Sequence, residues 1–328
     1  MLFIMSLNNT TDCRLLSAEE ALDYGYTLTE TLIIVAVLPA ISVIGILLNS
    51  AFLLTLYRVK DMKTDTNIYL ANLAIVDGLV LIIVPAEILK DYLYSPVIQL
   101  DVTFFERHHL CGILFLLVPF FTFTSSFFIS LVALERYTAI CRPAIHRQSN
   151  SKSRTFKLSL MSWIASFVIV ACHNGSFSND DVCMVLPSAP NVAISLKTCQ
   201  PSDLAYLSII MIDVCLFLLA FVGNCTLYIC IVRRLNKRKG RNTSRERNHV
   251  ARMLAINACV FFICLSPMTI AELIYLGMEY FGLEVDVGLL NWIALTTVAV
   301  NSAINPVIYN VFNPDYRKAF RRAFTCIK

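Results

Sequence analysis

Residues His108 to Cys141 read HHLCGILFLLVPFFTFTSSFFISLVALERYTAIC, and this stretch decides the fold. No charged residue occurs from Ile113 to Leu134. At a rise of about 1.5 Å per residue, this run covers a hydrocarbon core of about 30 Å, so it predicts a transmembrane helix. The helix ends in Glu135-Arg136-Tyr137, where lipid meets water. A charged side chain at that boundary extends toward water (snorkels), pairs with another group or has a function. For an isolated motif of this kind, snorkelling without a function is the alternative interpretation.

The composition extends this interpretation to the whole chain. Of the 328 residues, 57% are hydrophobic and only 15% are charged, which is too apolar for a water-soluble protein of this length. The apolar start, Met1 to Leu7, has no charged region before it and no small-residue cleavage site after it. We therefore expect a multi-pass membrane protein without a cleavable signal peptide, inserted by its first membrane helix.

Including the stretch quoted above, seven apolar segments of membrane-spanning length follow one another along the chain. They cover residues 31–57, 67–92, 108–141, 155–174, 203–235, 248–276 and 286–311. An eighth segment, Asn313 to Phe324, is amphipathic and should lie along the membrane surface. The alternation typical of β-barrel strands is missing, so we predict an all-α fold, a seven-transmembrane helix bundle with a short eighth helix. The expected organisation is an extracellular N-terminal segment (1–30), a seven-helix domain (31–311) and a surface helix with a short cytoplasmic tail (312–328).

The distribution of basic residues predicts the orientation. Of the 27 Lys and Arg, all but four fall in the segments after the first, third and fifth helices, at the adjacent helix ends and in the tail. The four exceptions are Arg14, Lys90, Arg107 and Lys197. By the positive-inside rule the N-terminus is extracellular and the C-terminus cytoplasmic, so the net charge of +4 reflects topology and not binding to nucleic acid. Glycosylation sequons at Asn8, Asn9 and Asn174 fall on the outer side.

The cysteines do not form a dense disulfide framework. Most of the 12 lie inside the apolar segments, where a small buried side chain is the simplest interpretation. Cys13, Cys111, Cys183 and Cys199 lie on the outer, oxidising side. A bridge from Cys111 to Cys199 would tie the loop between the fourth and fifth helices across the bundle mouth, with Cys183 as the competitor, and the sequence leaves this pairing open. Cys326 in the tail is a palmitoylation candidate, with an unmodified thiol as the alternative.

Other classes of protein fit poorly. The chain has no metalloprotease, nucleophile-elbow, P-loop or dinucleotide motif, so we expect no enzyme and no cofactor. A secondary transporter would show an internal repeat with broken helices, and none is visible.

An ordered set of motifs resembles the rhodopsin-like class of G-protein-coupled receptors, most closely its neuropeptide and peptide-hormone branch. The set is Gly45 and Asn49, Leu73 to Asp77, Cys111, Glu135-Arg136-Tyr137, Trp163, Tyr228, Phe261, Cys264 to Pro267, Asn301-Ser302, Asn305-Pro306-Val307-Ile308-Tyr309 and Phe312. The resemblance implies a receptor in the plasma membrane that binds an extracellular ligand and activates a heterotrimeric G protein.

The resemblance also implies how the inner end works. Arg136 is held by Glu135 at rest and is released when the sixth helix moves outward, while Tyr228 and Tyr309 turn inward. Pro267 and Pro306 each remove a helix hydrogen bond and allow kinks. Asp77 is a carboxylate near mid-membrane and needs a cation, a proton or a polar cage. In the family the positions of Ser125, Asn301, Ser302 and Asn305 line a sodium pocket around it, and a structural hydrogen-bond cluster is the alternative.

Two residues depart from the family pattern. Leu265 stands where the sixth helix usually has tryptophan, and Ala220 stands where the fifth usually has proline. The relay below the ligand would then depend on Phe261, Cys264, Leu265 and Pro267.

The outer half of the bundle suggests the ligand. Val118 stands where an amine receptor has aspartate, and Ala299 stands at the retinal-attachment position, which disfavours an aminergic receptor and excludes a photopigment. Glu87, Asp213 and Glu272 place acids there, and we expect no basic side chain at comparable depth. These residues predict a basic neuropeptide or peptide hormone. The alternatives are a chemosensory or lipid receptor of the same class or, less well supported, a transporter.

Overall fold

The structure is a computed structural model that describes residues 4–6, 14–15, 25–94, 113–149, 151–172, 177–185, 192–201, 203–236 and 244–325. Within these ranges seven helical spans are long and apolar enough to cross a membrane. The first comprises α2 (Leu28–Leu32), a π-helical stretch η1 (Ile33–Val37) and α3 (Leu38–Arg58). The others are α4 (Asp65–Tyr94), α6 (Ile113–Cys141), α8 (Lys152–Ala171), α9 (Asp203–Asn236), α10 (Ser244–Phe281) and α11 (Gly288–Phe312).

These spans coincide with the seven predicted segments to within a few residues at most ends, and the predicted seven-helix bundle is confirmed. Helices are favoured because lipid offers no hydrogen-bond partner, so each backbone amide must be satisfied within its own segment. Two short helical pieces, η2 (Lys60–Met62) and α7 (Pro143–Ser149), connect spans at one end of the bundle.

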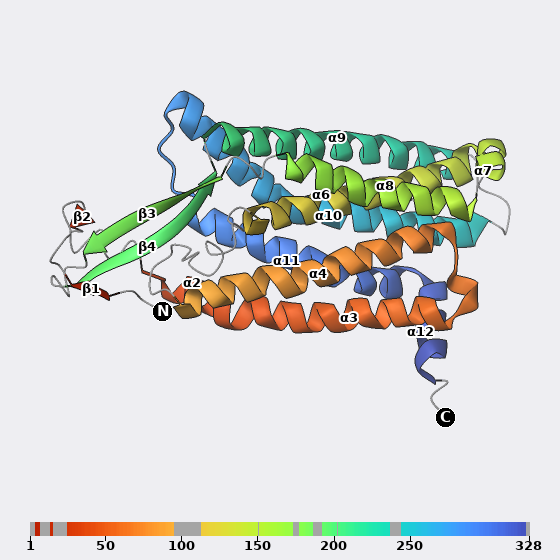
Figure 1. Cartoon of the computed structure of the whole chain (residues 1–328). Coiled ribbons are helices and arrows are strands. Elements are labelled where there is room, and N and C mark those ends of the chain that lie inside the picture. Colours follow the sequence, from red (N-terminus) through yellow and green to blue (C-terminus); the bar gives the residue numbers. More distant parts are fainter. Residues whose placement is uncertain are drawn as a thin grey trace.

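Helix α6 is the centre of the bundle. It contacts α4, α8, α9 and α10, whereas α3 packs on α4 and α11, and α10 packs on α11. Figure 1 shows the spans running side by side along one axis, with the N-terminus at one end and the C-terminus at the other. The segment that decides the fold in the sequence is therefore also the helix around which the others are arranged.

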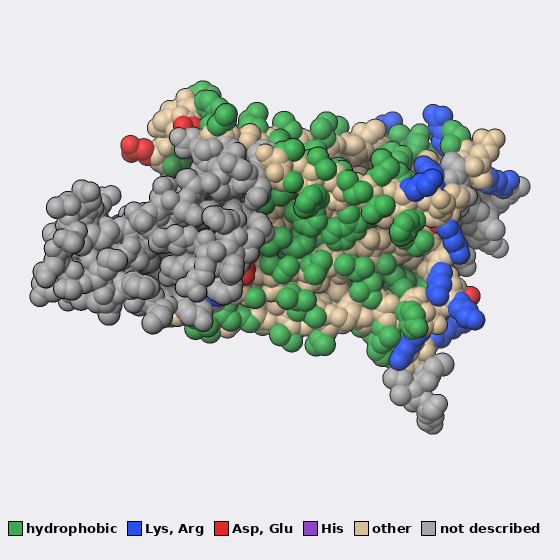
Figure 2. Space-filling view, in the orientation of Figure 1, with side chains coloured by type: hydrophobic (Ala, Val, Ile, Leu, Met, Phe, Trp, Pro, Cys, Tyr) green, Lys and Arg blue, Asp and Glu red, His purple; other side chains and the backbone are tan. Residues whose placement is uncertain are grey.

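The lateral surface is apolar. Leu47, Leu219 and Ile263 are each at least 65% exposed, as expected for side chains that face lipid. Figure 2 shows hydrophobic side chains over the middle of the bundle and Lys and Arg side chains gathered at the end that carries α12. This pattern matches a multi-pass membrane protein.

The eighth helix, α12 (Pro314–Thr325), turns away from the bundle axis at the inner end of α11 (Figure 1). Its Tyr316, Ala319 and Ala323 are buried against the bundle. The Tyr316 hydroxyl donates a hydrogen bond to Asn67 Oδ1 on α4, and Arg58 Nη1 on α3 donates to the Ala323 carbonyl at 2.8 Å. Burial raises the pKa of the Tyr316 hydroxyl. The helix is thus anchored by two other helices.

A small sheet at the opposite end is an addition to the predicted helical fold. Strands β3 (Phe177–Val185) and β4 (Val192–Pro201) form an antiparallel hairpin, flanked by β1 (Ile4–Ser6) on β4 and β2 (Arg14–Leu15) on β3. The sequence analysis missed the hairpin, although Val192, Ile194, Leu196 and Thr198 show the alternation that favours a strand.

Several predicted modifications cannot be placed. Asn8, Asn9, Asn174, Cys13, Cys111 and Cys326 lie outside the described residues. Cys183 and Cys199 lie on β3 and β4, where only the backbone is described, and they are not opposite each other, because Cys183 pairs with Ser195 and Asn179 with Cys199.

Candidate functional site

The polar core is centred on Asp77 of α4. The side chain is 0% exposed, and Asn305 Nδ2 on α11 donates a hydrogen bond of 2.7 Å to its Oδ2. Ser302, one turn earlier on α11, is also close enough to interact with this carboxyl group. A carboxylate in such a place is costly unless it is hydrogen-bonded or neutralised, so α11 supplies the donors that the buried group needs.

Helix α3 reaches the same core because Gly45 allows a close approach. A Cβ at Gly45 would lie 2.5 Å from Leu81 Cδ1 and 2.7 Å from Ala303 Cβ. One turn further on, Asn49 Nδ2 donates to the Ser302 carbonyl at 2.8 Å and to the Gly45 carbonyl at 2.9 Å. The small residue and the amide therefore join α3 to α11 beside Asp77.

The oxygen atoms around Asp77 fit a hard cation. Within the described part of the chain, the buried oxygens Asp77 Oδ1 and Asn301 Oδ1 accept no hydrogen bond. Ser125 on α6 and Ser302 on α11 are also buried. Carboxylate, amide and hydroxyl oxygens are the ligands that hard cations prefer.

At the end of the bundle that carries α12, Arg136 is bound to a residue that the sequence analysis did not select. Its Nη2 donates to Thr66 Oγ1 on α4 at 2.5 Å, and the hydroxyls of Tyr228 and Tyr316 are close enough to interact with its charge. The neighbouring Glu135 carboxylate is also close enough to interact with the charge of Arg136, and it lies 3.5 Å from His146 Nδ1 on α7. Thr66 is 70 residues away in sequence, and a threonine next to a helix start carries no signal that would have identified it.

The three predicted tyrosines, Tyr137, Tyr228 and Tyr309, pack near this end. Tyr309 is 1% exposed, and its ring centroid lies 5.1 Å from that of Phe52 and 5.7 Å from that of Tyr316. Tyr137 and Tyr228 are half-buried and pack against the cluster formed by Ile140, Ile231 and Ala251. Pro306 is buried within α11, one turn before Asn310.

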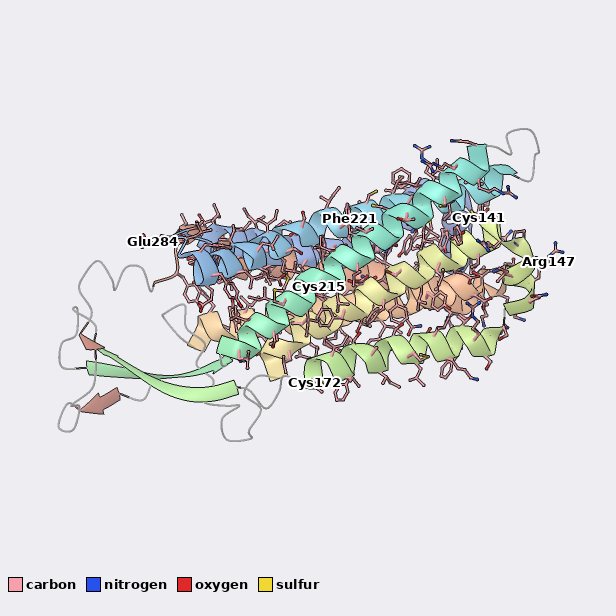
Figure 3. All side chains as sticks on the ribbon, turned by 90° about the horizontal axis from the view of Figure 1, so that it is seen from above. Cys141, Arg147, Cys172, Cys215, Phe221 and Glu284 are labelled. Carbon is pink, nitrogen blue, oxygen red and sulfur yellow. The ribbon has the colours of Figure 1, made fainter. Side chains whose placement is uncertain are left out.

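The relay segment of α10 forms an aromatic contact with α9. Phe261 and Leu265 are buried, Cys264 and Pro267 are half-buried, and the ring of Phe261 lies edge-on to Phe262 at 5.2 Å. Phe262 in turn contacts Phe217 and Phe221 at 5.6 and 5.2 Å. Figure 3 labels Phe221 on α9 where this helix passes the others. The sequence analysis did not select Phe217 and Phe221. Their spacing of four residues, which places two side chains on the same face of a helix, could have identified them.

The outer acids Asp213 and Glu272 are brought together. Asp213 on α9 is 7% exposed, Glu272 on α10 is half-buried, and their carboxyl groups are close enough to interact. They line one small cavity, with Leu265 and Met268 among its other walls. Leu265, the departure from the family pattern, therefore lies beside the acids.

Glu87 and Val118 are placed differently. Lys90 Nζ lies 2.7 Å from Glu87 Oε2, so our expectation that no base lies at the depth of the acids was wrong. The two residues are three apart on α4, a spacing that puts them on the same face of the helix. Val118 is half-buried on α6, one turn before Thr122, and does not line the cavity between the acids.

Seven spans, a buried carboxylate cage and an arginine at the inner end define a seven-helix membrane receptor. The profile described as "7 transmembrane receptor (rhodopsin family)" matches residues 48–309. The chain therefore belongs to the rhodopsin family of seven-transmembrane receptors, which are not enzymes.

Three curated relatives are receptors by name. The chain is 25% identical over 304 residues to the Neuropeptides B/W receptor type 2 of Homo sapiens, covering 89% of this chain and 85% of the relative. It is 25% identical over 308 residues to the Growth hormone secretagogue receptor type 1 of Mus musculus, covering 87% of this chain and 79% of the relative. It is 28% identical over 346 residues to the Thyrotropin-releasing hormone receptor of Gallus gallus, covering 95% and 82%.

Proposed function

We propose that this chain is a plasma-membrane receptor that binds an extracellular basic peptide and activates a heterotrimeric G protein. The observation that carries the proposal is one continuous packed cluster. It includes Tyr316 and Tyr309 at the inner end, Phe261 in the middle and Leu265, which also lines the cavity between the outer acids. A packed cluster of this kind is a physical route by which occupancy of one end can bias the arrangement of the other.

The proposed orientation places the sheet outside the cell and α12 in the cytosol. The concentration of Lys and Arg side chains at the α12 end supports it, because basic residues are retained on the cytoplasmic side (Figure 2). Residues 1–30 would then be an extracellular segment.

At the inner end, activation would release Arg136. In the structure the Thr66 hydroxyl holds its guanidinium group against α4. Outward movement of the inner part of α10 would open space beside α6, so that Arg136 exchanges Thr66 for carbonyls of the C-terminus of a G-protein α subunit. Tyr228 and Tyr309 would support this open state.

A sodium ion beside Asp77 is part of the same proposal. Asp77 Oδ1 and Asn301 Oδ1, with the hydroxyls of Ser125 and Ser302, would hold it and offset the buried charge. Sodium would then favour the inactive arrangement, because it occupies a site that α4, α6 and α11 form together.

The peptide ligand is supported by the named relatives and by the outer acids. The relatives are receptors for neuropeptides or peptide hormones, and Asp213 and Glu272 provide a complement for a cationic group.

The test is nucleotide exchange on purified G proteins of the stimulatory, inhibitory and phospholipase-activating classes, with membranes from cells that express the chain. A panel of basic and amidated peptides should contain at least one that raises exchange, and cells should respond with calcium or cyclic-nucleotide signals. Membranes with an Arg136→Ala variant at matched surface expression serve as the control. Exchange that is identical with and without the chain, for every peptide and each G protein, would contradict the proposal.

A further inference from the structure

The cavity between the outer acids is lined by oxygen-bearing side chains from three helices. Asp213 comes from α9, Thr269 and Glu272 from α10, and Thr122 and Ser126 from α6. Its volume is about 10 Å³, which is room for one water molecule. No Lys, Arg or His lines it among the described residues.

The acid pair requires a proton. Two carboxylates that line one small, water-poor cavity repel each other, so the pair holds one proton that the two groups share. A pair that shares one proton carries one negative charge. This charge has no counterion among the side chains that line the cavity, and a single positive charge would balance it.

A second, independent observation also points to a missing donor. Ser126 is 9% exposed and lines the cavity, yet its hydroxyl has no hydrogen-bond partner in the described part of the chain. Thr269 Oγ1 makes only a long contact of 3.5 Å with the Leu265 carbonyl. These hydroxyls therefore have lone pairs available for a group that brings N–H donors into the cavity.

Size and donor number select the kind of cation. A primary ammonium is about as large as water and has three N–H donors in a compact arrangement, whereas a guanidinium is a wide planar fork. Glu87 is a weaker candidate, because Lys90 already compensates its charge.

We propose that the cavity between Asp213 and Glu272 is a binding site for a primary ammonium group, either a lysine side chain or a free amino terminus. The inference rests on the proposed peptide-receptor function and specifies the part of the ligand that enters deepest. The two carboxyls and Ser126 accept the three N–H donors, and the shared proton stays on the acid pair. Because Leu265 also lines the cavity, occupancy acts directly on the packed cluster.

The probe is n-butylammonium, with n-butyltrimethylammonium as the matched control that has the same charge and no N–H donor. The full chain in lipid nanodiscs is heated at fixed ionic strength, and its unfolding midpoint is measured against probe concentration. We expect a saturable rise with n-butylammonium and none with the trimethyl compound. Equal effects of the two compounds would overturn the proposal, because they would reflect charge or chain partitioning alone.

Variants separate the acid pair from other acids. The single variants Asp213→Asn and Glu272→Gln keep one carboxylate and replace the shared proton by an amide donor, so the dissociation constant should change by less than about threefold. The double variant has no carboxylate and should bind at least about tenfold more weakly. The control pair Glu279→Gln and Glu284→Gln changes exposed acids at the same end of the bundle and should not alter binding.

Undiminished binding by the double variant would overturn the proposal, as would full loss in either single variant. If the double variant does not fold, the single variants and the comparison of the two compounds still test the proposal. If peptides stimulate nucleotide exchange but n-butylammonium does not bind, this inference alone is overturned. Absence of exchange would instead contradict the proposed function.

Discussion

The inner half of the bundle and the cavity between the outer acids handle buried polar groups in opposite ways. In the inner half a donor meets an acceptor from a different helix, as in Asn305 with Asp77, Arg136 with Thr66 and Tyr316 with Asn67. In the outer half Asp213 and Glu272 place like groups together. Complementary pairs fix one arrangement of the helices, whereas a like pair is stabilised only when a proton or a cation joins it. The difference suggests an inner half built for one resting geometry and an outer half built to receive a cation.

The tightest inner contact gives the largest expected effect. In Gly45→Ala the new Cβ would meet Leu81 and also the backbone of Ala303, whose Cα would be 3.0 Å away. We expect a loss of about 3 kcal/mol in the free energy of unfolding, because a helix backbone cannot move aside cheaply. Surface expression and the thermal midpoint in detergent measure it.

Gly277→Ala is the matched control in the outer half. Its Cβ would lie 2.7 Å from the Cδ1 of Leu283, a half-exposed side chain that can rotate away. The midpoint should stay unchanged or rise slightly, because alanine favours a helix more than glycine does. Equal losses in the two variants would remove the distinction between the halves.

The next effect concerns the donor to Asp77. Asn305→Ala removes the 2.7 Å hydrogen bond to a fully buried carboxyl group, and we expect a loss of about 2 kcal/mol. Asn310→Ala is the control, because Asn310 bonds only its own helix at the Pro306 carbonyl. Thermal unfolding with and without added sodium checks both variants, and equal midpoints would show that Asp77 does not depend on Asn305.

A smaller effect is expected at Arg136. Thr66→Val keeps the shape of the side chain but removes the hydroxyl that accepts the hydrogen bond from Arg136. This hydrogen bond should stabilise the resting position of Arg136 by about 1.5 kcal/mol. Basal nucleotide exchange should then rise by about tenfold at most, since 1.4 kcal/mol corresponds to one factor of ten. Thr226→Val, on the exposed face of α9, should leave basal exchange unchanged. A basal rate unchanged in Thr66→Val would mean that the contact does not restrain Arg136.

The smallest effect is expected at α12. Tyr316→Phe removes the hydrogen bond to Asn67 and should cost about 1 kcal/mol, seen as faster amide exchange in residues 314–325. Since burial raises the pKa of this hydroxyl, its contribution should persist below pH 10 and be lost as the pH rises further. The exposed Tyr280→Phe is the control. Identical exchange in α12 for wild type and Tyr316→Phe would show that the hydroxyl does not anchor the helix.

Much of the fold followed from the sequence because lipid imposes one strong rule. The apolar lengths around Gly45, Asp77 and Arg136 predicted the spans, and the ordered motifs predicted which residues share the interior. Contacts between distant residues could not be predicted, because Thr66 and Asn67 meet Arg136 and Tyr316 only after the helices pack. Lys90 was misjudged for a different reason: it was counted only among the basic residues of the outer face, although its spacing of three residues from Glu87 allowed a pair.

The sheet has a practical consequence for the start of the chain. Residues Ile4 to Ser6 cover the outer edge of β4 through pairs such as Ile4 with Ile194. Deleting these residues would leave backbone N–H and C=O groups of residues 192–194 open for pairing with another molecule. Truncated versions should therefore be more prone to self-association through that exposed strand than the full chain.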